Sequence, residues 1–545
     1  MAGPTIALAQ VNPCVGDLVG NAALVLDYAQ KAADAGAGIV AFPEMVVTGY
    51  PIEDLAVRAS FQRAANAALA TLAADLANAG LGDLTVIVGT LGVSATGAPL
   101  NQAAVVRSGV VEHRYAKHHL PNYGVFDERR IFAPGSEPLV ITVDDARIGI
   151  AICEDIWQDG GPVASLADAK LDLLLVLNGS PFEEGKGHIR TDLARRRAAQ
   201  VGAPVAYVNM WGGQDDLVFD GHSFIVGPDG AWLANSPGFA NDLLVWTLPS
   251  AGELPSQARV VDFASDDEQA YRAVVTGLRD YVVKNGFTSI VLGVSGGIDS
   301  ALAAAIAADA IGGENVVGVA MPSAYSSQHA YDDAADLCKR IGADFRVQPI
   351  GPMVDAFLSE VPLTGVAEEN LQARMRGVVL MGLSNREGHL VIAPGNKSEL
   401  ATGYATIYDA GSIGGYAPLK DLDKTRVWDL ARWRNAEAER NGETAPIPVN
   451  SIDKVPSAEL RPGQTDQDSL PPYELLDEVL DAYVEHAEGR EELLARGFDP
   501  AVVDTVMRLV DRAEWKRRQY PLGPKVTSLA FGRDRRLPVT SRWRE

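Results

Sequence analysis

Three short segments in the first half of the chain carry side chains that could cleave an amide bond. IVAFPEMVVTGYP places Glu44 just past an apolar strand, EHRYAKHHLPNY contains Lys117, and RIGIAICEDIW delivers Cys153 where a strand ends. A thiol beside a carboxylate base and a cation can be deprotonated for nucleophilic attack. The cation would also stabilise a tetrahedral oxyanion. Spacing alone leaves open the alternative that Cys153 is a small buried hydrophobe.

The neighbours of these residues offer other interpretations. His118 or His119 could pair with Cys153, but adjacent side chains on an extended segment point in opposite directions, so at most one could face the thiol. We therefore favour Lys117. Glu154 and Asp155 directly follow Cys153 and could act as acid–base groups. We favour the interpretation that they orient neighbouring groups or cap the turn.

The second half contains a loop suited to phosphate. An apolar strand runs into SGGIDS at 295–300, and an alanine-rich helix follows at once. The two glycines allow backbone N–H groups to converge on an anion, and the helix N-terminus adds partial positive charge. No Lys follows, so this is not a Walker loop and it suits pyrophosphate as a leaving group. Asp299 is a candidate Mg²⁺ ligand. The alternative is a plain strand-to-helix turn in which Asp299 or Ser300 is the N-cap.

A second loop of this kind lies at 395–399. After an expected strand at Leu390–Ala393, the sequence GNKSE opens another helix. Glu399 thus lies at the end of a strand, where open α/β sheets bind ligands. It could share Mg²⁺ with Asp299.

These motifs resemble the N-type ATP pyrophosphatase family, and within it the NAD synthetases. The blocks GVAEENLQARMRG at 365–377 and PLGPKVTSLAFGRDRRLPVT at 521–540 match that family in the same order. The resemblance implies adenylation of a carboxyl group with release of pyrophosphate, with Mg²⁺ held by Asp299 and Glu399. It implies ATP-binding residues at Gly293, Val294, Ser295, Gly296, Gly297, Ile298, Asp299, Ser300 and Pro394. It implies deamido-NAD-binding residues at Asn370, Glu399, Tyr404, Asp409 and Lys525.

The first half resembles the carbon–nitrogen hydrolase (nitrilase) superfamily through FPE, YAKHHL and CEDIW. The resemblance implies that Glu44 is the general base, that Lys117 gives electrostatic support, and that Cys153 is the nucleophile of a thioester mechanism. In members that use glutamine, it further implies glutamine-binding residues at Tyr123, Ser180 and Lys186.

The elements that must position these residues alternate between strands and helices, which favours α/β layers. In the first half we expect strands at Thr5–Val11, Ile39–Phe42, Leu84–Gly89, Ile148–Cys153, Leu171–Leu177, Val205–Asn209 and Phe224–Val226. Repeated β–α–β order after residue 268 predicts a parallel, doubly wound, Rossmann-like sheet. The resemblance implies an α-β-β-α sandwich for the first half. We expect a glutaminase domain at 1–250, a Pro- and Ser-rich linker at 251–267 and a synthetase domain at 268–545.

Composition excludes several other classes of protein. The 545 residues carry a net charge of −24 with a pI near 4.8, which argues against a nucleic-acid partner. Three cysteines cannot form a disulfide framework, and the longest apolar runs are far shorter than a membrane span. The N-terminus lacks the features of a signal peptide. We therefore expect a cytoplasmic protein without a membrane partner. A basic C-terminus from Trp515, with nine Lys and Arg against two Asp and Glu, is expected in the dinucleotide site.

Together the two halves resemble an amidotransferase ligase. Glutamine, ATP and deamido-NAD are the expected small-molecule partners, and ammonia released from glutamine would pass to the adenylated nicotinate to give NAD. Both resembled families form assemblies, so a homo-oligomer is expected. The alternatives are another glutamine-dependent adenylating amidotransferase, or a non-catalytic nucleotide-sensing protein.

Overall fold

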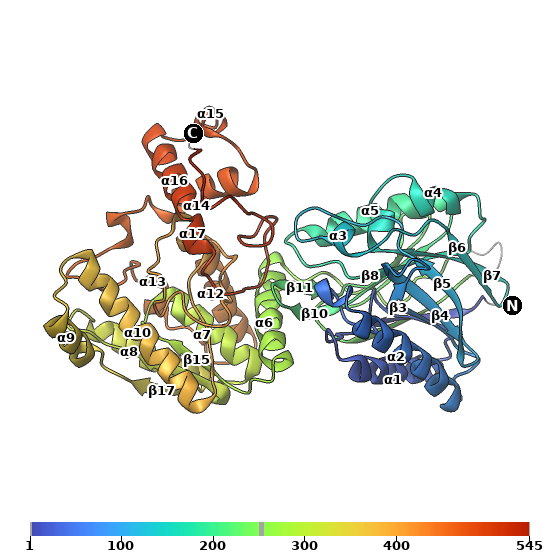
Figure 1. Cartoon of the computed structure of the whole chain (residues 1–545), viewed down its shortest axis with the longest axis horizontal. Coiled ribbons are helices and arrows are strands. Elements are labelled where there is room, and N and C mark those ends of the chain that lie inside the picture. The colour runs from blue at the N-terminus through green and yellow to red at the C-terminus, as the bar shows by residue number, and fades with distance from the viewer. Residues whose placement is uncertain (1–2, 250–254, 544–545) are drawn as a thin grey trace. The chain divides into compact units, whose positions relative to one another are not determined.

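The structure, a computed structural model, describes residues 3–249 and 255–543. The chain divides into two compact units, which are Met1–Gln214 with Val218–Ser265 and Asp215–Leu217 with Asp266–Glu545 (Figure 1). The expected end of the first domain at residue 250 and the first part of the expected linker, 251–254, lie outside the described residues.

The first unit contains two six-stranded sheets. The first sheet has the order β14-β1-β2-β3-β4-β5 and the second has the order β13-β12-β9-β8-β7-β6. The strands of the first are β1 Thr5–Gln10, β2 Ile39–Ala41, β3 Thr85–Val93, β4 Pro99–Arg107, β5 Val110–Ala116 and β14 Asp242–Thr247. Those of the second are β6 Leu139–Val143, β7 Ala146–Ile152, β8 Leu173–Asn178, β9 Val205–Asn209, β12 Phe224–Val226 and β13 Trp232–Asn235. A separate hairpin pairs β10 Trp211–Gln214 with β11 Leu217–Asp220.

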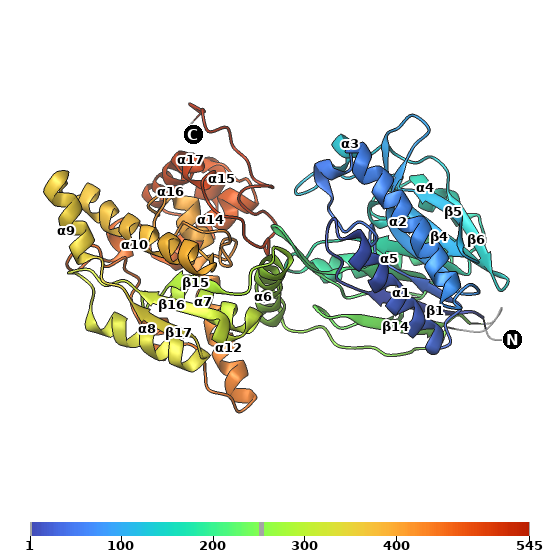
Figure 2. The ribbon, with the colours of Figure 1, turned by 60° about the horizontal axis from the view of Figure 1, so that its bottom comes forward.

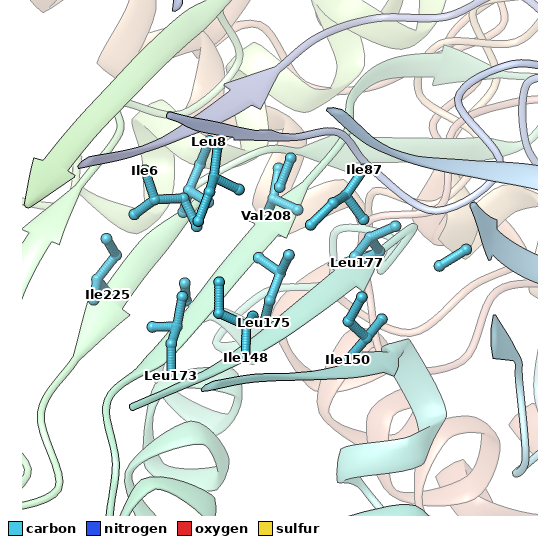
Figure 3. Close-up of a cluster of buried hydrophobic side chains, with 14 of the residues drawn as sticks. Ile6, Leu8, Ile87, Ile148, Ile150, Leu173, Leu175, Leu177, Val208 and Ile225 are labelled. Atoms are coloured by element: carbon cyan, nitrogen blue, oxygen red, sulfur yellow. The ribbon is translucent and has the colours of Figure 1, made fainter. Parts of the chain in front are cut away.

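The two sheets face each other and helices cover their outer sides. Side chains from both sheets, among them Ile6, Ile87, Ile150 and Leu175, form the buried layer between them (Figure 3). Helices α1 Leu18–Asp34 and α2 Ala59–Asn78 cover the first sheet, and α4 Gly161–Ala167 and α5 Lys186–Val201 cover the second. This arrangement confirms the predicted α-β-β-α sandwich.

The central strands are apolar because both of their faces are covered. All six residues of β8, LLLVLN, are buried, as expected for a strand packed between a helix layer and a second sheet. In contrast, β5 reads VVEHRYA and leaves most of its residues partly or fully exposed. Neither this edge strand, nor β4 beside it, nor the edge strand β6 of the second sheet was among the predicted strands.

Residues after the gap pack on the first unit. The Ala258 N–H donates to the Leu233 carbonyl (2.7 Å), and the Asn235 N–H donates to the Arg259 carbonyl (3.0 Å), so this segment runs beside β13. Phe263 packs against the rings of His222 and Trp232. The described part of the expected linker is therefore held by backbone and aromatic contacts.

The second unit has a four-stranded sheet with helices on both faces. The strands β15 Ile290–Gly293, β16 Val316–Ala320, β17 Asp344–Val347 and β18 Leu390–Val391 are all parallel, in the order β17-β16-β15-β18. One face packs on α9 Gly351–Glu360 and α10 Val366–Glu387. The other packs on α7 Ile298–Ile311 and α8 Gln328–Ile341, and α6 Asp266–Lys284 and α12 Lys424–Arg440 pack on α7 (Figure 2). The predicted doubly wound fold is confirmed.

A helical cluster completes the second unit. Its apolar core includes Leu400, Leu476, Val506 and Phe531. The remaining helices of the unit are α11 Lys397–Thr402, α13 Val449–Asp453, α14 Tyr473–Leu480, α15 Arg490–Ala495, α16 Pro500–Arg512 and α17 Glu514–Arg517. Over the described residues, no helix combines the length and apolar character needed to cross a lipid bilayer.

Candidate active sites

Cys153 lies at a sharp turn between a strand and a helical turn. Strand β7 ends at Ile152, and Cys153 begins the short 3₁₀ helix Cys153–Ile156. Its φ of +43° is in the left-handed region, which costs a non-glycine residue about 1–3 kcal/mol and persists only where the surroundings enforce it. Only 5% of Cys153 is exposed. The strained backbone and the buried thiol make this turn a candidate functional position.

Lys117 is buried between two carboxylates. Its Nζ donates to Glu44 Oε1 at 2.7 Å and lies 2.9 Å from Glu128, with both lysine and Glu44 side chains fully buried. Glu128 comes from the short helix α3 Glu128–Ile131 and also accepts a hydrogen bond from the Tyr50 hydroxyl at 2.9 Å. A buried ammonium ion needs such partners because an unpaired charge would be costly to desolvate.

Two further hydrogen-bond donors, one to each carboxylate oxygen, fix the orientation of Glu44. The Asn101 side-chain amide donates to Glu44 Oε1 at 2.7 Å, and the Gly179 N–H donates to Oε2 at 2.9 Å. Glu44 therefore has three donors from three different parts of the chain, counting Lys117. A carboxylate held in this way can act as a base of fixed position.

Burial and neighbouring charges set the protonation states of Cys153, Lys117 and Glu128. Burial, with the charge of Glu44, raises the pKa of the Cys153 thiol well above its usual value, while Lys117 opposes this shift. Burial also disfavours the charged form of Lys117, but Glu128 and Glu44 outweigh it and raise its pKa. Burial raises the pKa of Glu128 to about 7 against the pull of Lys117. The resting site therefore holds a neutral thiol beside a lysine cation.

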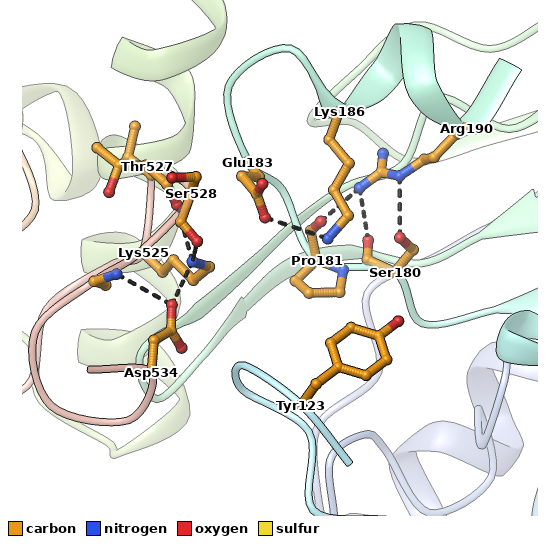
Figure 4. A network of polar contacts seen from close by, with 12 residues as sticks. Tyr123, Ser180, Pro181, Glu183, Lys186, Arg190, Lys525, Thr527, Ser528 and Asp534 are labelled. Atoms are coloured by element: carbon orange, nitrogen blue, oxygen red, sulfur yellow. Dashed lines mark hydrogen bonds and ion pairs between the residues drawn. The ribbon is translucent and has the colours of Figure 1, made fainter. Parts of the chain in front are cut away.

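The three predicted glutamine-binding residues lie in the same unit. The Tyr123 hydroxyl donates to Glu154 Oε2 at 2.9 Å, which ties it to the residue that follows Cys153. Lys186 begins α5, and its Nζ lies 3.5 Å from Glu183. The Ser180 hydroxyl accepts a hydrogen bond from Arg190 Nε at 3.0 Å (Figure 4).

Arg190 organises the loop that carries Ser180. Its guanidinium donates to the carbonyls of Ser180 (3.1 Å) and Pro181 (2.6 Å). It also binds both carboxylate oxygens of Asp220, at 2.7 and 2.8 Å. Since Arg190 is only 2% exposed, its bonds fix the start of this loop from inside the unit.

In the second unit, the SGGIDS loop is closed by its own hydroxyl groups. The Ser300 hydroxyl accepts a bond from the Ser295 N–H (3.1 Å) and donates to the Gly297 carbonyl (3.1 Å). Gly296 has φ +74°, and a Cβ there would lie 2.4 Å from the Ala330 carbonyl oxygen, so only glycine fits.

The elements on either side of the loop place the other predicted ATP-binding residues. Helix α7 begins at Ile298, which puts Asp299 in its first turn. Gly293 ends β15, and the Val294 N–H bonds the Val319 carbonyl at 3.0 Å.

Asp299 and Glu399 are brought together by two further residues. Asn396 caps α11 by accepting the Glu399 N–H at 2.9 Å, and its side-chain amide donates to Asp299 at 2.8 Å. The ammonium of Lys424 binds Asp299 and lies 3.8 Å from Glu399. Burial and the charge of Asp299 raise the pKa of Glu399 to about 8. Pro394, the last predicted ATP-binding residue, lies just before Asn396 and offers only its carbonyl.

This donor set fits Mg²⁺. Two carboxylates are compensated by a cation, and Mg²⁺ is usually held by one or two carboxylates with substrate phosphates completing its coordination. Within residues 3–249 and 255–543, no three His, Cys, Asp or Glu side chains are grouped so as to hold a metal ion by themselves.

The predicted dinucleotide residues fall into two groups. Asn370 on α10 accepts a hydrogen bond from the Thr406 hydroxyl at 2.6 Å, which joins it to the segment between Tyr404 and Asp409. The Tyr404 N–H bonds the Glu399 carbonyl at 2.9 Å. Lys525 differs, because its ammonium binds Asp534 and the carbonyls of Thr527 (2.9 Å) and Ser528 (2.8 Å) within its own loop (Figure 4).

Several polar residues at these sites were not predicted, and Glu128 and Asn396 show two reasons. Glu128 lies in PNYGVFDERRIF, where nothing in the sequence distinguishes it from the neighbouring acids, and only its burial beside Lys117 identifies it. Asn396 stood inside the GNKSE block, and its position three residues before Glu399 is the sequence signal of a helix N-cap.

Comparison with known families agrees with the two units. A family model described as carbon–nitrogen hydrolase matches residues 5–253, and one described as NAD synthase matches residues 270–520.

Comparison with individual proteins extends over the whole chain. The glutamine-dependent NAD(+) synthetase of Rhodobacter capsulatus is 46% identical, and 99% of each chain is covered. That of Acinetobacter baylyi is 43% identical, covering 99% of this chain and 98% of the relative. A solved glutamine-dependent NAD+ synthetase from Acinetobacter baumannii, in complex with ADP, has a TM-score of 0.78 at 40% identity and 98% coverage of both chains. The chain therefore belongs to the glutamine-dependent NAD(+) synthetase family.

Proposed function

We propose that the two units divide the family's reaction between them. The overall change is deamido-NAD, ATP, glutamine and water to NAD, AMP, diphosphate and glutamate. The first unit would release ammonia from glutamine, and the second would join it to adenylated nicotinate. The observation that carries the proposal is the buried Lys117, held between Glu44 and Glu128 in the unit that contains the strained turn at Cys153.

In the glutaminase reaction, Cys153 Sγ attacks the side-chain amide carbon of glutamine. Glu44 takes the thiol proton and delivers it to the departing ammonia, which leaves a glutamyl thioester. The Lys117 ammonium stabilises the oxyanion. Water, deprotonated by Glu44, then cleaves the thioester to give glutamate and free thiol. A neutral resting thiol suits this order because the proton leaves only when substrate is present.

Tyr123, Ser180 and Lys186 are the proposed contacts to glutamine. Lys186 offers a cation for the substrate carboxylate, and the Tyr123 and Ser180 hydroxyls offer polar contacts. The bond from Tyr123 to Glu154 places this tyrosine one residue from the nucleophile.

In the synthetase reaction, a nicotinate carboxylate oxygen attacks the α-phosphorus of ATP and pyrophosphate leaves. Ammonia then attacks the acyl-adenylate carbon and AMP leaves. The proposed ATP-binding residues are Gly293–Ser300, with Pro394, and the N–H groups of the SGGIDS loop receive phosphate oxygens. Asp299 and Glu399 would hold Mg²⁺, which neutralises phosphate charge when bound. Asn370, Glu399, Tyr404, Asp409 and Lys525 are the proposed deamido-NAD residues.

We also propose that the protein is a cytoplasmic homo-oligomer. In the described residues the three cysteines form no disulfide, and free thiols persist in a reducing compartment such as the cytoplasm. Three apolar side chains on α9 and α10 are exposed, namely Phe357 (39%), Val366 (70%) and Val378 (62%), which suits an interface between copies. Sedimentation of Val378→Asp would test this, since a lower mass than wild type is expected.

Two substitutions test the division of labour. Cys153→Ala should abolish glutamine-dependent NAD formation and keep ammonia-dependent synthesis. Cys338→Ala changes a buried thiol of the second unit and should keep both kinds of synthesis. Asp299→Ala should abolish both syntheses but keep glutamine hydrolysis. Failure of ammonia to support the folded Cys153→Ala protein would contradict the division. A near-normal rate in Asp299→Ala would remove this residue from the ATP site.

A further inference from the structure

Asp155 is a fully buried carboxylate with four hydrogen-bond donors. Oδ1 accepts from the N–H groups of His118 and His119, both at 2.9 Å. Oδ2 accepts from the Ile152 N–H at 2.9 Å and from the Tyr115 hydroxyl at 2.7 Å. Its exposed fraction is 0%. Four donors fill the four acceptor positions of a carboxylate, so Asp155 has no acceptor position left for glutamine.

The donors belong to the two chain segments that carry Lys117 and Cys153. Tyr115 precedes Lys117 by two residues, and His118 and His119 follow it directly. Ile152 immediately precedes Cys153, and Asp155 itself lies two residues after it in the 3₁₀ turn. One carboxylate therefore binds the segment of the cation to the segment of the nucleophile.

Each segment needs this support for a different reason. Cys153 has φ +43°, and such a conformation is kept only where surrounding contacts enforce it. On one side, strand β4 holds the backbone of Lys117, because the Lys117 N–H donates to the Asn101 carbonyl at 2.8 Å. The bonds to Asp155 fix the residues that follow it, in the direction of the nucleophile's turn.

We propose that Asp155, with the Tyr115 hydroxyl, is a positioning residue of the glutaminase that sets the distance between the Lys117 ammonium and the Cys153 thiol. The inference rests on the roles proposed above for Lys117 and Cys153. A purely structural carboxylate would affect stability alone. A positioning residue also affects turnover and the thiol's acidity, because the attraction between thiolate and lysine falls as the two move apart.

Asp155→Asn tests this most directly. Asparagine keeps the shape but replaces an acceptor oxygen with an NH₂ group that faces at least one backbone N–H, so at least one of the four bonds is lost. We expect kcat for glutamine hydrolysis to fall about 100-fold with KM changed less than about threefold, as for a misplaced reacting group. Ammonia-dependent NAD synthesis should stay at the wild-type rate.

The readout that separates positioning from stability is the pH profile of Cys153 alkylation by iodoacetamide, followed by peptide mass spectrometry. In Asp155→Asn its midpoint should move to higher pH, because the thiolate is farther from Lys117. Tyr115→Phe removes one of the four bonds and should shift the midpoint in the same direction, with kcat lowered about three- to tenfold. Asp172→Asn, which changes an exposed carboxylate that accepts the Arg147 N–H at 2.8 Å, should leave both quantities unchanged.

Wild-type kcat and an unshifted alkylation profile in folded Asp155→Asn would overturn the proposal. If that variant does not fold, Tyr115→Phe decides alone, and wild-type behaviour there would overturn it equally. The outcome is distinct from failure of the proposed function, which would show in the wild-type and Cys153→Ala proteins. Glutamine hydrolysis that survives Cys153→Ala would refute the function before any Asp155 variant is compared.

Discussion

The ammonium of Lys424 binds the carboxylate of Asp299 and lies 3.8 Å from that of Glu399. Both carboxylates are largely buried, with about a fifth of each side chain exposed, at 19% and 22%. Two like charges at such a site repel each other, and this repulsion contributes to the raised pKa of Glu399, about 8. Lys424 therefore supplies the positive charge that lets the two carboxylates lie together without another cation.

Lys424→Met should destabilise the unliganded protein and make it more responsive to Mg²⁺. Removing the cation leaves two facing carboxylates, at a cost of about 2 kcal/mol after allowance for their partial exposure. The melting temperature should fall in EDTA, and Mg²⁺ without nucleotide should raise it more than in wild type. Arg346→Met, which breaks surface pairs with Asp344 and Glu387, is the control. Equal Mg²⁺ responses in the Lys424 variant and wild type would contradict this role.

Glu128 should make the stability of the first unit depend on pH. Burial raises its folded-state pKa to about 7 from 4.5, so its contribution is fully present below pH 4.5 and is lost as pH rises through 7. The Glu128→Gln protein does not lose this stability as pH rises, because glutamine does not ionise. The stability of the variant relative to wild type should therefore increase between pH 4.5 and pH 7, by up to about 3 kcal/mol. Calorimetric melting across this range measures it. A flat difference for Glu128→Gln would refute the assignment.

The sequence predicted both folds because their central strands are apolar on both faces and alternate with helices. Strand Val205–Asn209 and helix Gln328–Ile341 are found at their predicted bounds. Strand β5 was missed because it lies at the edge of its sheet and leaves most of its residues exposed, and its polar residues weaken the apolar signal.

The candidate sites were predictable only where a residue follows a strand end within a distinctive motif. Cys153 directly follows β7, and Asp299 and Glu399 lie in the first turns of the helices that come after β15 and β18. Glu128 does not satisfy this condition, because it reaches Lys117 from a four-residue helix in a loop, and no periodicity places such a residue in three dimensions. The contacts of Lys525 were equally unpredictable, since they depend on how its own loop folds back to Asp534.

Arg190 should control the affinity for glutamine through the Ser180 loop. Arg190→Lys keeps the charge, but its single ammonium nitrogen cannot bind both oxygens of Asp220 and also reach Ser180 and Pro181. We expect KM for glutamine to rise about tenfold and stability to fall by about 1–3 kcal/mol. Ammonia-dependent synthesis should be unaffected. Arg195→Lys on the same helix, which pairs with Asp192 near the surface, is the matched control. An unchanged KM would show that the loop does not depend on this guanidinium.

Lys525 and Asp534 should affect the binding of deamido-NAD in opposite directions. All three N–H donors of the Lys525 ammonium are engaged, by the Thr527 and Ser528 carbonyls and by Asp534. An anionic ligand that binds Lys525 must therefore compete with the Asp534 carboxylate. Lys525→Met should weaken binding about tenfold, whereas Asp534→Asn, which removes the competing charge, should tighten it about threefold.

Calorimetric titration of the full chain with deamido-NAD distinguishes these outcomes. Asp504→Asn, at an exposed pair with Arg490, controls for loss of a negative charge from the acidic chain as a whole. If Asp534→Asn weakens binding as much as Lys525→Met does, the pair holds the loop in shape and does not compete with the ligand. If neither variant changes the affinity, Lys525 does not contact the dinucleotide, and the basic C-terminal segment must be assigned another role.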